Sequence, residues 1–119
     1  MTAEAKLWQL VRRLAEKTAE GAVVWEATAD KNTYQTSFPE NGVRISEVQR
    51  RDLDPRILVE VLDGNGNVIE GSYDVDIVPT DGRPEALRTI KDLYTTIRRR
   101  ALGVDSALDN LLSELEKAS

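Results

Sequence analysis

Residues 56–69, which read RILVEVLDGNGNVI, carry the strongest structural signal in the chain. Alternating apolar side chains lead to Asp63, a glycine-rich turn follows, and an apolar segment resumes beyond it, as in a β-hairpin. A loop of Gly64 to Gly66 would pair Asp63 with Asn67 and keep the apolar sides of both strands together, whereas a two-residue Asn65-Gly66 turn would mix them. We therefore expect the three-residue loop, with its last glycine in the left-handed conformation.

This register predicts an acidic surface on the opposite side of the hairpin. Glu60 would lie across from Glu70 and Arg56 across from Asp74, with Asp76 one step further along. Neighbouring carboxylates are mildly unfavourable in water, and partial desolvation would raise the pKa of one of them, as in acid/base catalysis. The surface is therefore either a solvated acidic sheet face or, alternatively, a site for a divalent cation or a catalytic acid pair.

The remaining sequence predicts helices before and after a run of strands. Apolar residues at helical spacing indicate a helix over residues 4–20, ended by Gly21. Alternation predicts strands over residues 23–27, 34–38, 43–45, 56–62 and 67–78. A helix with a heptad-like apolar seam follows Pro84 and ends at Gly103. A last helix, from about Asp105, is expected to bury Leu108, Leu111, Leu112 and Leu115.

This order predicts an α+β fold in a single domain covering residues 1–119. Successive strands joined by short turns favour a five-stranded antiparallel meander. The N-terminal helix and two C-terminal helices are expected to pack on one face of it. Trp25 alternates with apolar neighbours and is predicted to lie in the core, with Trp8 at the margin of the core.

Composition excludes several classes of function. The chain of 119 residues has no Cys and no His, so thiolate or imidazole catalysis and Cys/His zinc sites are impossible. We expect no cofactor and assign no catalytic residue. With a net charge of −5, attraction to nucleic acid or anionic lipid is not expected. The longest apolar run, Ala22 to Trp25, is too short for a membrane span, and charged residues near the N-terminus exclude a signal peptide. The expected location is the cytoplasm.

The hairpin turn also resembles a calcium loop. Asp63, Asn65 and Asn67 occupy its first, third and fifth positions and Asp74 its twelfth. The sixth position, however, requires glycine for a sharp turn and is Val68 here. The flanking segments also read as strands and not as helices. These residues are weak candidates for a metal site, and the hairpin is the favoured interpretation.

The only basic run consists of Arg98, Arg99 and Arg100. Three adjacent guanidinium groups could bind an anion or an acidic partner. They also lie at a predicted helix C-terminus, where positive charge complements the helix dipole. The structural role is the favoured interpretation.

Four short motifs lie along the chain: Lys17-Thr18-x-x-Gly21-x-x-x-Trp25, Asp63-x-x-Gly66, Leu93-Tyr94-x-x-x-Arg98-Arg99 and Val104-Asp105. In these motifs the chain resembles a group of small bacterial proteins of uncharacterised function. The resemblance implies the same layout of a helix, five strands and two helices, and a bacterial source. It implies no activity and no functional residue.

Three hypotheses of function follow. The first is a non-enzymatic protein-interaction or regulatory module, for example an immunity-like or antitoxin-like acidic inhibitor of a basic partner protein. The second is an enzyme that uses the carboxylates of the fourth and fifth strands, with or without a divalent metal. The third is a homodimer formed through the C-terminal helices. A concave pocket that holds Glu60 and Glu70 would favour the enzyme, whereas an exposed apolar helix seam would favour a binding surface.

Overall fold

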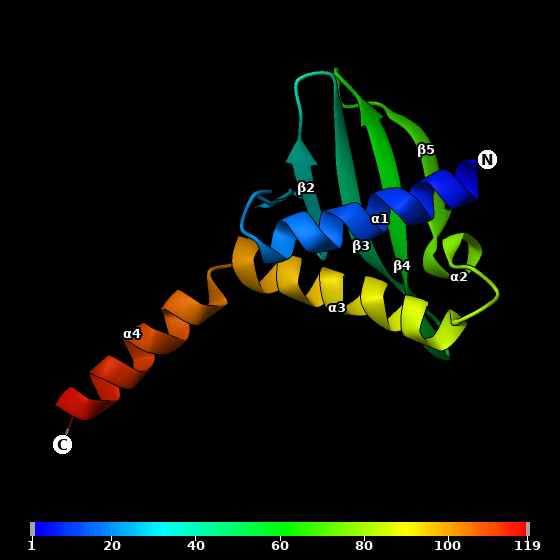
Figure 1. Ribbon diagram of the computed structural model, residues 1–119. Coiled ribbons are helices and arrows are strands. Elements are labelled where there is room, and N and C mark those ends of the chain that lie inside the picture. The colour runs from blue at the N-terminus through cyan, green and yellow to red at the C-terminus, as the bar shows by residue number, and fades with distance from the viewer. Residues whose placement is uncertain (1, 119) are drawn as a thin grey trace.

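The computed structural model describes residues 2–118 and confirms the predicted α+β class (Figure 1). The elements, in chain order, are α1 (Ala3–Ala19), β1 (Glu26–Ala27), β2 (Thr33–Ser37), β3 (Asn41–Arg50), β4 (Leu53–Asp63), β5 (Val68–Tyr73), α2 (Asp74–Ile77), α3 (Arg83–Ala101) and α4 (Val104–Lys117). The strands form one antiparallel sheet in the order β1-β2-β3-β4-β5. The helices α1 and α3 lie across one face of this sheet.

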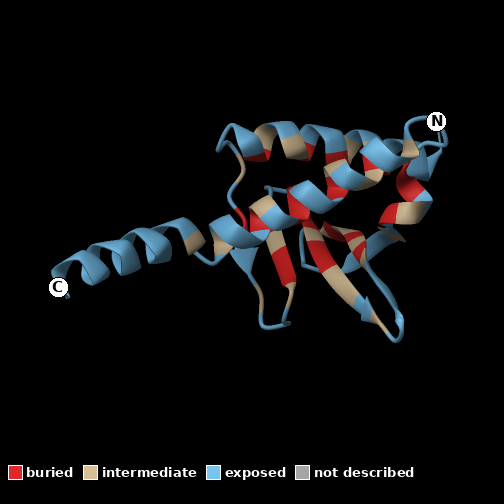
Figure 2. Cartoon of the chain, turned by 90° about the horizontal axis from the view of Figure 1, so that it is seen from below, coloured by how far each residue is buried: buried red, intermediate tan, exposed pale blue. Residues whose placement is uncertain are grey.

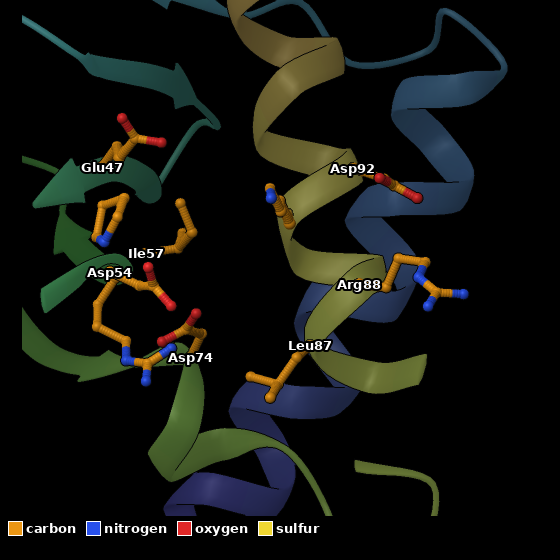
Figure 3. A pocket seen from close by; sticks show the side chains of 10 residues that line it. Glu47, Asp54, Ile57, Asp74, Leu87, Arg88 and Asp92 are labelled. Atoms are coloured by element: carbon orange, nitrogen blue, oxygen red, sulfur yellow. The ribbon is translucent and has the colours of Figure 1, made fainter. Parts of the chain in front are cut away.

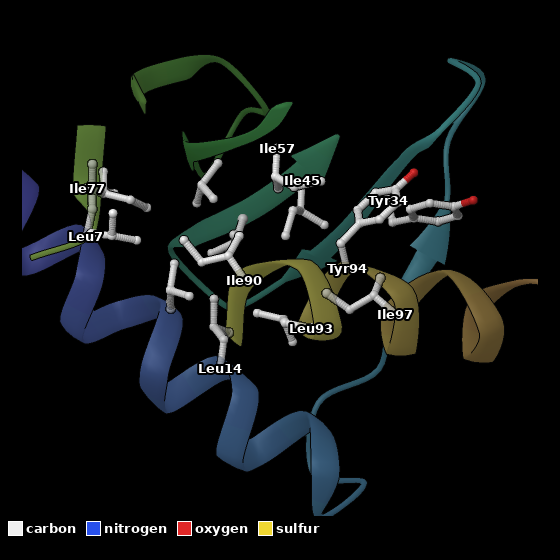
Figure 4. Close-up of a cluster of buried hydrophobic side chains, with 14 of the residues drawn as sticks. Leu7, Leu14, Tyr34, Ile45, Ile57, Ile77, Ile90, Leu93, Tyr94 and Ile97 are labelled. Atoms are coloured by element: carbon white, nitrogen blue, oxygen red, sulfur yellow. The ribbon is translucent and has the colours of Figure 1, made fainter. Parts of the chain in front are cut away.

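The core lies between the sheet and these two helices. The hydroxyl oxygen of Thr2 caps α1 by accepting a hydrogen bond from the Ala5 N–H at 3.1 Å. Helical spacing then places Leu7, Val11 and Leu14 on the buried side of α1. Isoleucines and a leucine of α3 meet isoleucines and valines of the sheet in one continuous cluster (Figure 4). The Ile45 and Ile90 labelled there are 1% and 0% exposed.

Trp25 connects the end of α1 to the core. It is buried as predicted, and its indole N–H donates to Thr18 Oγ1 at 3.0 Å. Thr18 is itself fully buried, and its carbonyl oxygen accepts a hydrogen bond from Arg100. Trp8 packs against the core while remaining partly exposed, which also confirms its prediction. These bonds attach the last turn of α1 both to the loop that follows it and to the end of α3.

A second polar contact inside the core involves two tyrosines. Tyr34 on β2 and Tyr94 on α3 form an edge-to-face pair with ring centroids 5.8 Å apart. The Tyr94 hydroxyl donates to the carbonyl oxygen of Asn32 at 3.0 Å. Burial, followed by the nearby Tyr34 and Glu47, raises the pKa of Tyr94 to about 12. The neutral phenol is therefore the form that this fold stabilises.

Three segments differ from the predicted strands. The predicted strand over residues 23–27 is a strand only at β1, its last two residues. The segment between the predicted strands 43–45 and 56–62 is not a long loop, because β3 runs to Arg50 and β4 begins at Leu53, with Asp52 in the left-handed conformation at φ 60°. The predicted strand over residues 67–78 is wrong in its second half, because the chain leaves the sheet after Tyr73 and forms α2. Ile77 and Val78 still reach the core, but from a helical turn and its end. Apolar spacing in so short a segment fits either conformation.

The last helix, α4, extends away from the body of the protein (Figure 2). The expectation that it buries four leucines is wrong, since none of its residues is buried. Gly103 precedes it in the left-handed conformation at φ 64° and separates it from α3. The molecule is consequently elongated, with extents of 60 × 34 × 30 Å.

Candidate functional site

The predicted acidic pair on β4 and β5 is not formed. Next to the turn the pairing is as expected, with the Asp63 N–H donating to the Asn67 carbonyl oxygen at 2.9 Å. A β-bulge then adds one residue on β5, so that Val61 pairs with Glu70 and Glu60 pairs with Gly71. Paired residues share a face of the sheet, and alternation therefore places Glu60 and Glu70 on opposite faces. The expected register is wrong beyond the bulge, and the two carboxylates cannot act as a pair.

The other two residues of the proposed acidic surface are not in the sheet. Asp74 begins α2 and is 7% exposed, and its Oδ1 accepts the N–H of Val75 at 2.9 Å. Asp76 lies in the same helical turn and is exposed. The expected pairing of Arg56 with Asp74 therefore does not occur, because β5 ends at Tyr73. The four acidic residues do not share a surface.

Asp74 instead lines a cleft of about 540 Å³ between the end of the sheet and α3 (Figure 3). The side chains of Asp54 and Asp74 point into it from the sheet side, and Leu87 points into it from α3. Arg56 and Lys91 add positive charge to its lining. Its volume is within the range of ligand sites. Across residues 2–118, however, no three acidic side chains come together in a group that could hold a metal ion, here or elsewhere.

The turn after β4 is a hairpin and not a calcium loop. Asp63 Oδ1 accepts the backbone N–H groups of Asn65 and Asn67, both at 2.9 Å, and Oδ2 accepts the Asn67 side-chain amide at 3.3 Å. The backbone N–H groups of Asn67 and Asn65 lower the pKa of Asp63. The carboxylate therefore faces hydrogen-bond donors of its own loop. Gly66 has φ 85°, which confirms the predicted left-handed position.

Two of the three arginines at the end of α3 have partners within the chain. Arg99 forms an ion pair with Asp105 at 3.0 Å, and Arg100 donates to the carbonyl oxygen of Thr18. Arg98 belongs to the same last turn, where the positive charge faces the negative end of the helix dipole. These contacts join α3 to α1 and to the start of α4, in agreement with the structural interpretation.

An apolar surface that the sequence analysis expected to be buried is exposed on α4. It consists of four leucines at positions i, i+3, i+4 and i+7, which fall on one side of the helix. We call this set the leucine row: Leu108, Leu111, Leu112 and Leu115, with 47%, 55%, 62% and 69% of their surfaces exposed. The helical period identified this face correctly, but nothing in the sequence shows whether a face of that kind is covered. The break at Gly103 is the one available signal that α4 leaves the body.

The chain matches no protein-family model, no curated protein and no solved structure. Within residues 2–118, no helix combines the length and the apolar character needed to cross a membrane.

Proposed function

We propose that this protein is a non-enzymatic protein-interaction module and that α4 supplies its binding surface. The observation that carries the proposal is the leucine row, four large apolar side chains on a helix without a single buried residue. Monomeric proteins rarely leave contiguous apolar surface of this kind in water, and such patches mark interaction sites.

The energetics of α4 support a partner. Complete burial of a leucine side chain is worth about 1.5–3 kcal/mol. Each member of the row is about half exposed, so a partner that covered it would gain roughly 1 kcal/mol per leucine and roughly 4 kcal/mol for the row. Losses of side-chain and rigid-body freedom would offset part of this gain.

The stability of α4 as a helix leads to the same proposal. It has 14 residues, and isolated helices of about 12–15 residues are marginal in water. Gly103 gives it no side-chain cap, and one ion pair, Arg99 to Asp105, supports its first turn. Apolar packing is the usual source of helix stability in proteins, and for α4 a partner would supply that packing.

Spacing indicates the mode of binding. Leucines at i, i+3, i+4 and i+7 are the anchors by which an amphipathic helix lies against another helix or in an apolar groove. The alternative of a carboxylate-dependent enzyme is not proposed, because Glu60 and Glu70 lie on opposite faces of the sheet. An acidic inhibitor that bound its target through the carboxylates of β4 and β5 is not proposed for the same reason.

The test compares two double variants of α4. Leu111→Gln with Leu112→Gln removes the centre of the leucine row, and Asn110→Gln with Ser113→Gln makes the matched change on the polar side of the same helix. The assay is affinity capture from the native host, quantified by mass spectrometry. The wild type and the control should recover the same partner protein. The leucine variant should recover at least about tenfold less of it, which corresponds to a loss of about 1.4 kcal/mol in binding free energy. Equal recovery with all three proteins would show that α4 is not the binding surface.

A further inference from the structure

We infer that the partner of the leucine row is a second copy of this chain, bound through α4 in antiparallel orientation. The inference rests on the proposed function, because it takes α4 to be a binding surface and names what binds there. Two observations carry it: the symmetry of the leucine spacing and the direction in which α4 leaves the body. A third, the distribution of charge along the helix, opposes association and therefore determines how association depends on salt.

The first observation is that the leucine row reads the same in both directions. Its pattern is Leu-x-x-Leu-Leu-x-x-Leu, with its centre between Leu111 and Leu112. A two-fold symmetric contact requires a surface that is complementary to itself. In an antiparallel pair about this centre, Leu108 lies opposite the second copy's Leu115, and Leu111 lies opposite the second copy's Leu112. All eight leucines are then used, and no member of the row is left facing solvent beyond the end of the contact.

The second observation is where the body lies relative to α4. The body is joined only to the N-terminal end of this helix, which spans about 21 Å (Figure 1). Packed helices have axes about 8–10 Å apart. The shorter extents of the molecule are 34 and 30 Å, so a parallel pair would force two bodies of this width together at one end. In an antiparallel pair the bodies lie at opposite ends of the paired helices and do not collide.

The third observation concerns charge. The helix α4 has a net charge of −3, because it carries four acidic residues and one lysine: Asp105, Asp109, Glu114, Glu116 and Lys117. Arg99 already offsets Asp105 at 3.0 Å. Helical spacing places Asp109 and Glu116 on the same side of the leucine row, so an antiparallel pair brings acidic flanks together. Apolar contact must therefore act against like-charge repulsion, and association should strengthen as salt increases.

The direction in which affinity changes with salt distinguishes a second copy from a basic partner. Repulsion between exposed charges is screened when the Debye length falls from about 10 Å at 0.1 M salt to about 3 Å at 1 M. A second copy should therefore bind more tightly in high salt. A basic groove on another protein would bind less tightly in high salt, because the attraction to the acidic flanks would be screened. A helix pair of this length is smaller than a standard interface of about 1,600 Å², so the dimer should be reversible.

The experiment is sedimentation equilibrium of the full chain over a range of concentrations up to about 1 mM, where even an interaction of about 4 kcal/mol is detectable. We expect a monomer–dimer equilibrium whose association constant rises about threefold or more between 0.1 M and 1 M NaCl, as screening predicts. The Leu111→Gln, Leu112→Gln variant should remain monomeric, and the Asn110→Gln, Ser113→Gln control should dimerise as the wild type does. Circular dichroism checks that the leucine variant keeps its fold, so that a loss of dimer is not a loss of structure.

Orientation can be tested because the chain has no cysteine. Leu108→Cys and Leu115→Cys are prepared as separate single variants and oxidised in air, alone and as a mixture. The antiparallel pair predicts disulfide cross-links between the two variants and few within either one. Efficient cross-linking of Leu108→Cys with itself would overturn the antiparallel arrangement.

A wild type that stays monomeric at about 1 mM in both salts would overturn self-association, since the contact would then be weaker than about 4 kcal/mol. If leucine-dependent capture of another protein persisted in that case, the proposed interaction function would stand with a different partner. If capture were also independent of the leucine row, both proposals would fail. A dimer that persists in the leucine variant would show that another surface forms it and would likewise overturn the inference.

Discussion

The position of α4 predicts that shortening a leucine there leaves the free energy of unfolding almost unchanged. Leu111 is 55% exposed and belongs to a helix with no buried residue, so Leu111→Ala opens no cavity. Alanine is also a slightly better helix former than leucine. We expect a change within about 0.5 kcal/mol, as for other exposed positions. The comparison is Ile90→Ala, which removes a fully buried side chain and should cost about 2–5 kcal/mol.

Urea unfolding followed by tryptophan fluorescence measures both variants. Trp25 is buried in the core and Trp8 packs against it, so the signal reports on the body of the protein. Dilute protein is required, because a dimer would add a concentration-dependent term to the stability. The slope of free energy against urea should be the same for all three proteins if the folded body is the same.

If Leu111→Ala lowered the free energy of unfolding by more than about 2 kcal/mol at high dilution, this reasoning would be refuted, because a loss of that size is typical of a buried leucine. It would show that α4 packs on the body in solution. A loss that is absent at dilution and appears as the protein is concentrated would instead agree with pairing through the leucine row.

Three further predictions concern the core and the hairpin turn. Thr18→Val leaves the buried indole N–H of Trp25 without an acceptor and should destabilise the fold by about 1–3 kcal/mol in urea unfolding; an unchanged midpoint would contradict the role of this bond. The pKa of Tyr94 is raised from 10.0 to about 12, so the contribution of its neutral phenol to stability is complete below pH 10 and is lost as the pH rises toward 12. The melting temperature of the wild type should therefore fall over that interval, and that of Tyr94→Phe should fall less. The pKa of Asp63 is lowered, so its contribution is present above its unfolded value of 3.8 and is lost as the pH falls through the folded value. Asp63→Ala should be less stable than the wild type at pH 7 and should lose less stability on acidification; parallel acid-unfolding curves for the two proteins would argue against this.

The parts of the fold that could be predicted from sequence are those set by local chemistry. Gly66 could be placed in the left-handed conformation because the three-residue loop requires it, and Trp25 in the core because its neighbours alternate. The first helix could be predicted from the spacing of its apolar residues and from Gly21. In each case the residues that decide the structure lie within a few positions of one another.

The register of β5 could not be predicted, for a physical reason. The expectation assumed that one side of β5 is buried, so that a shift by one residue would be costly. In the structure β5 is an edge strand, and Val68, Ile69 and Tyr73 are 47%, 59% and 40% exposed. With neither side strongly buried, one extra residue at Ile69 costs little, and the bulge displaces Glu70 from Glu60. The candidate acidic site therefore depended on the part of the sheet that burial specifies least.

The apolar pattern of the C-terminal region leads to a related argument about function. One seam, with alternating steps of four and three residues, continues through both helices: Ile90, Tyr94, Ile97, Ala101, Val104, Leu108, Leu111 and Leu115. In α3 this seam is buried against the sheet, except at Ala101 near the end of the helix, where it is partly exposed. Beyond Gly103 the chain turns away, and from Leu108 onward the same seam is exposed along α4. Periodicity thus identifies the apolar side of a helix but not the surface that covers it. The apolar side of α3 is covered by the sheet of the same chain. The apolar side of α4 would be covered by the leucine row of a second copy, whose leucine spacing is the same in both directions.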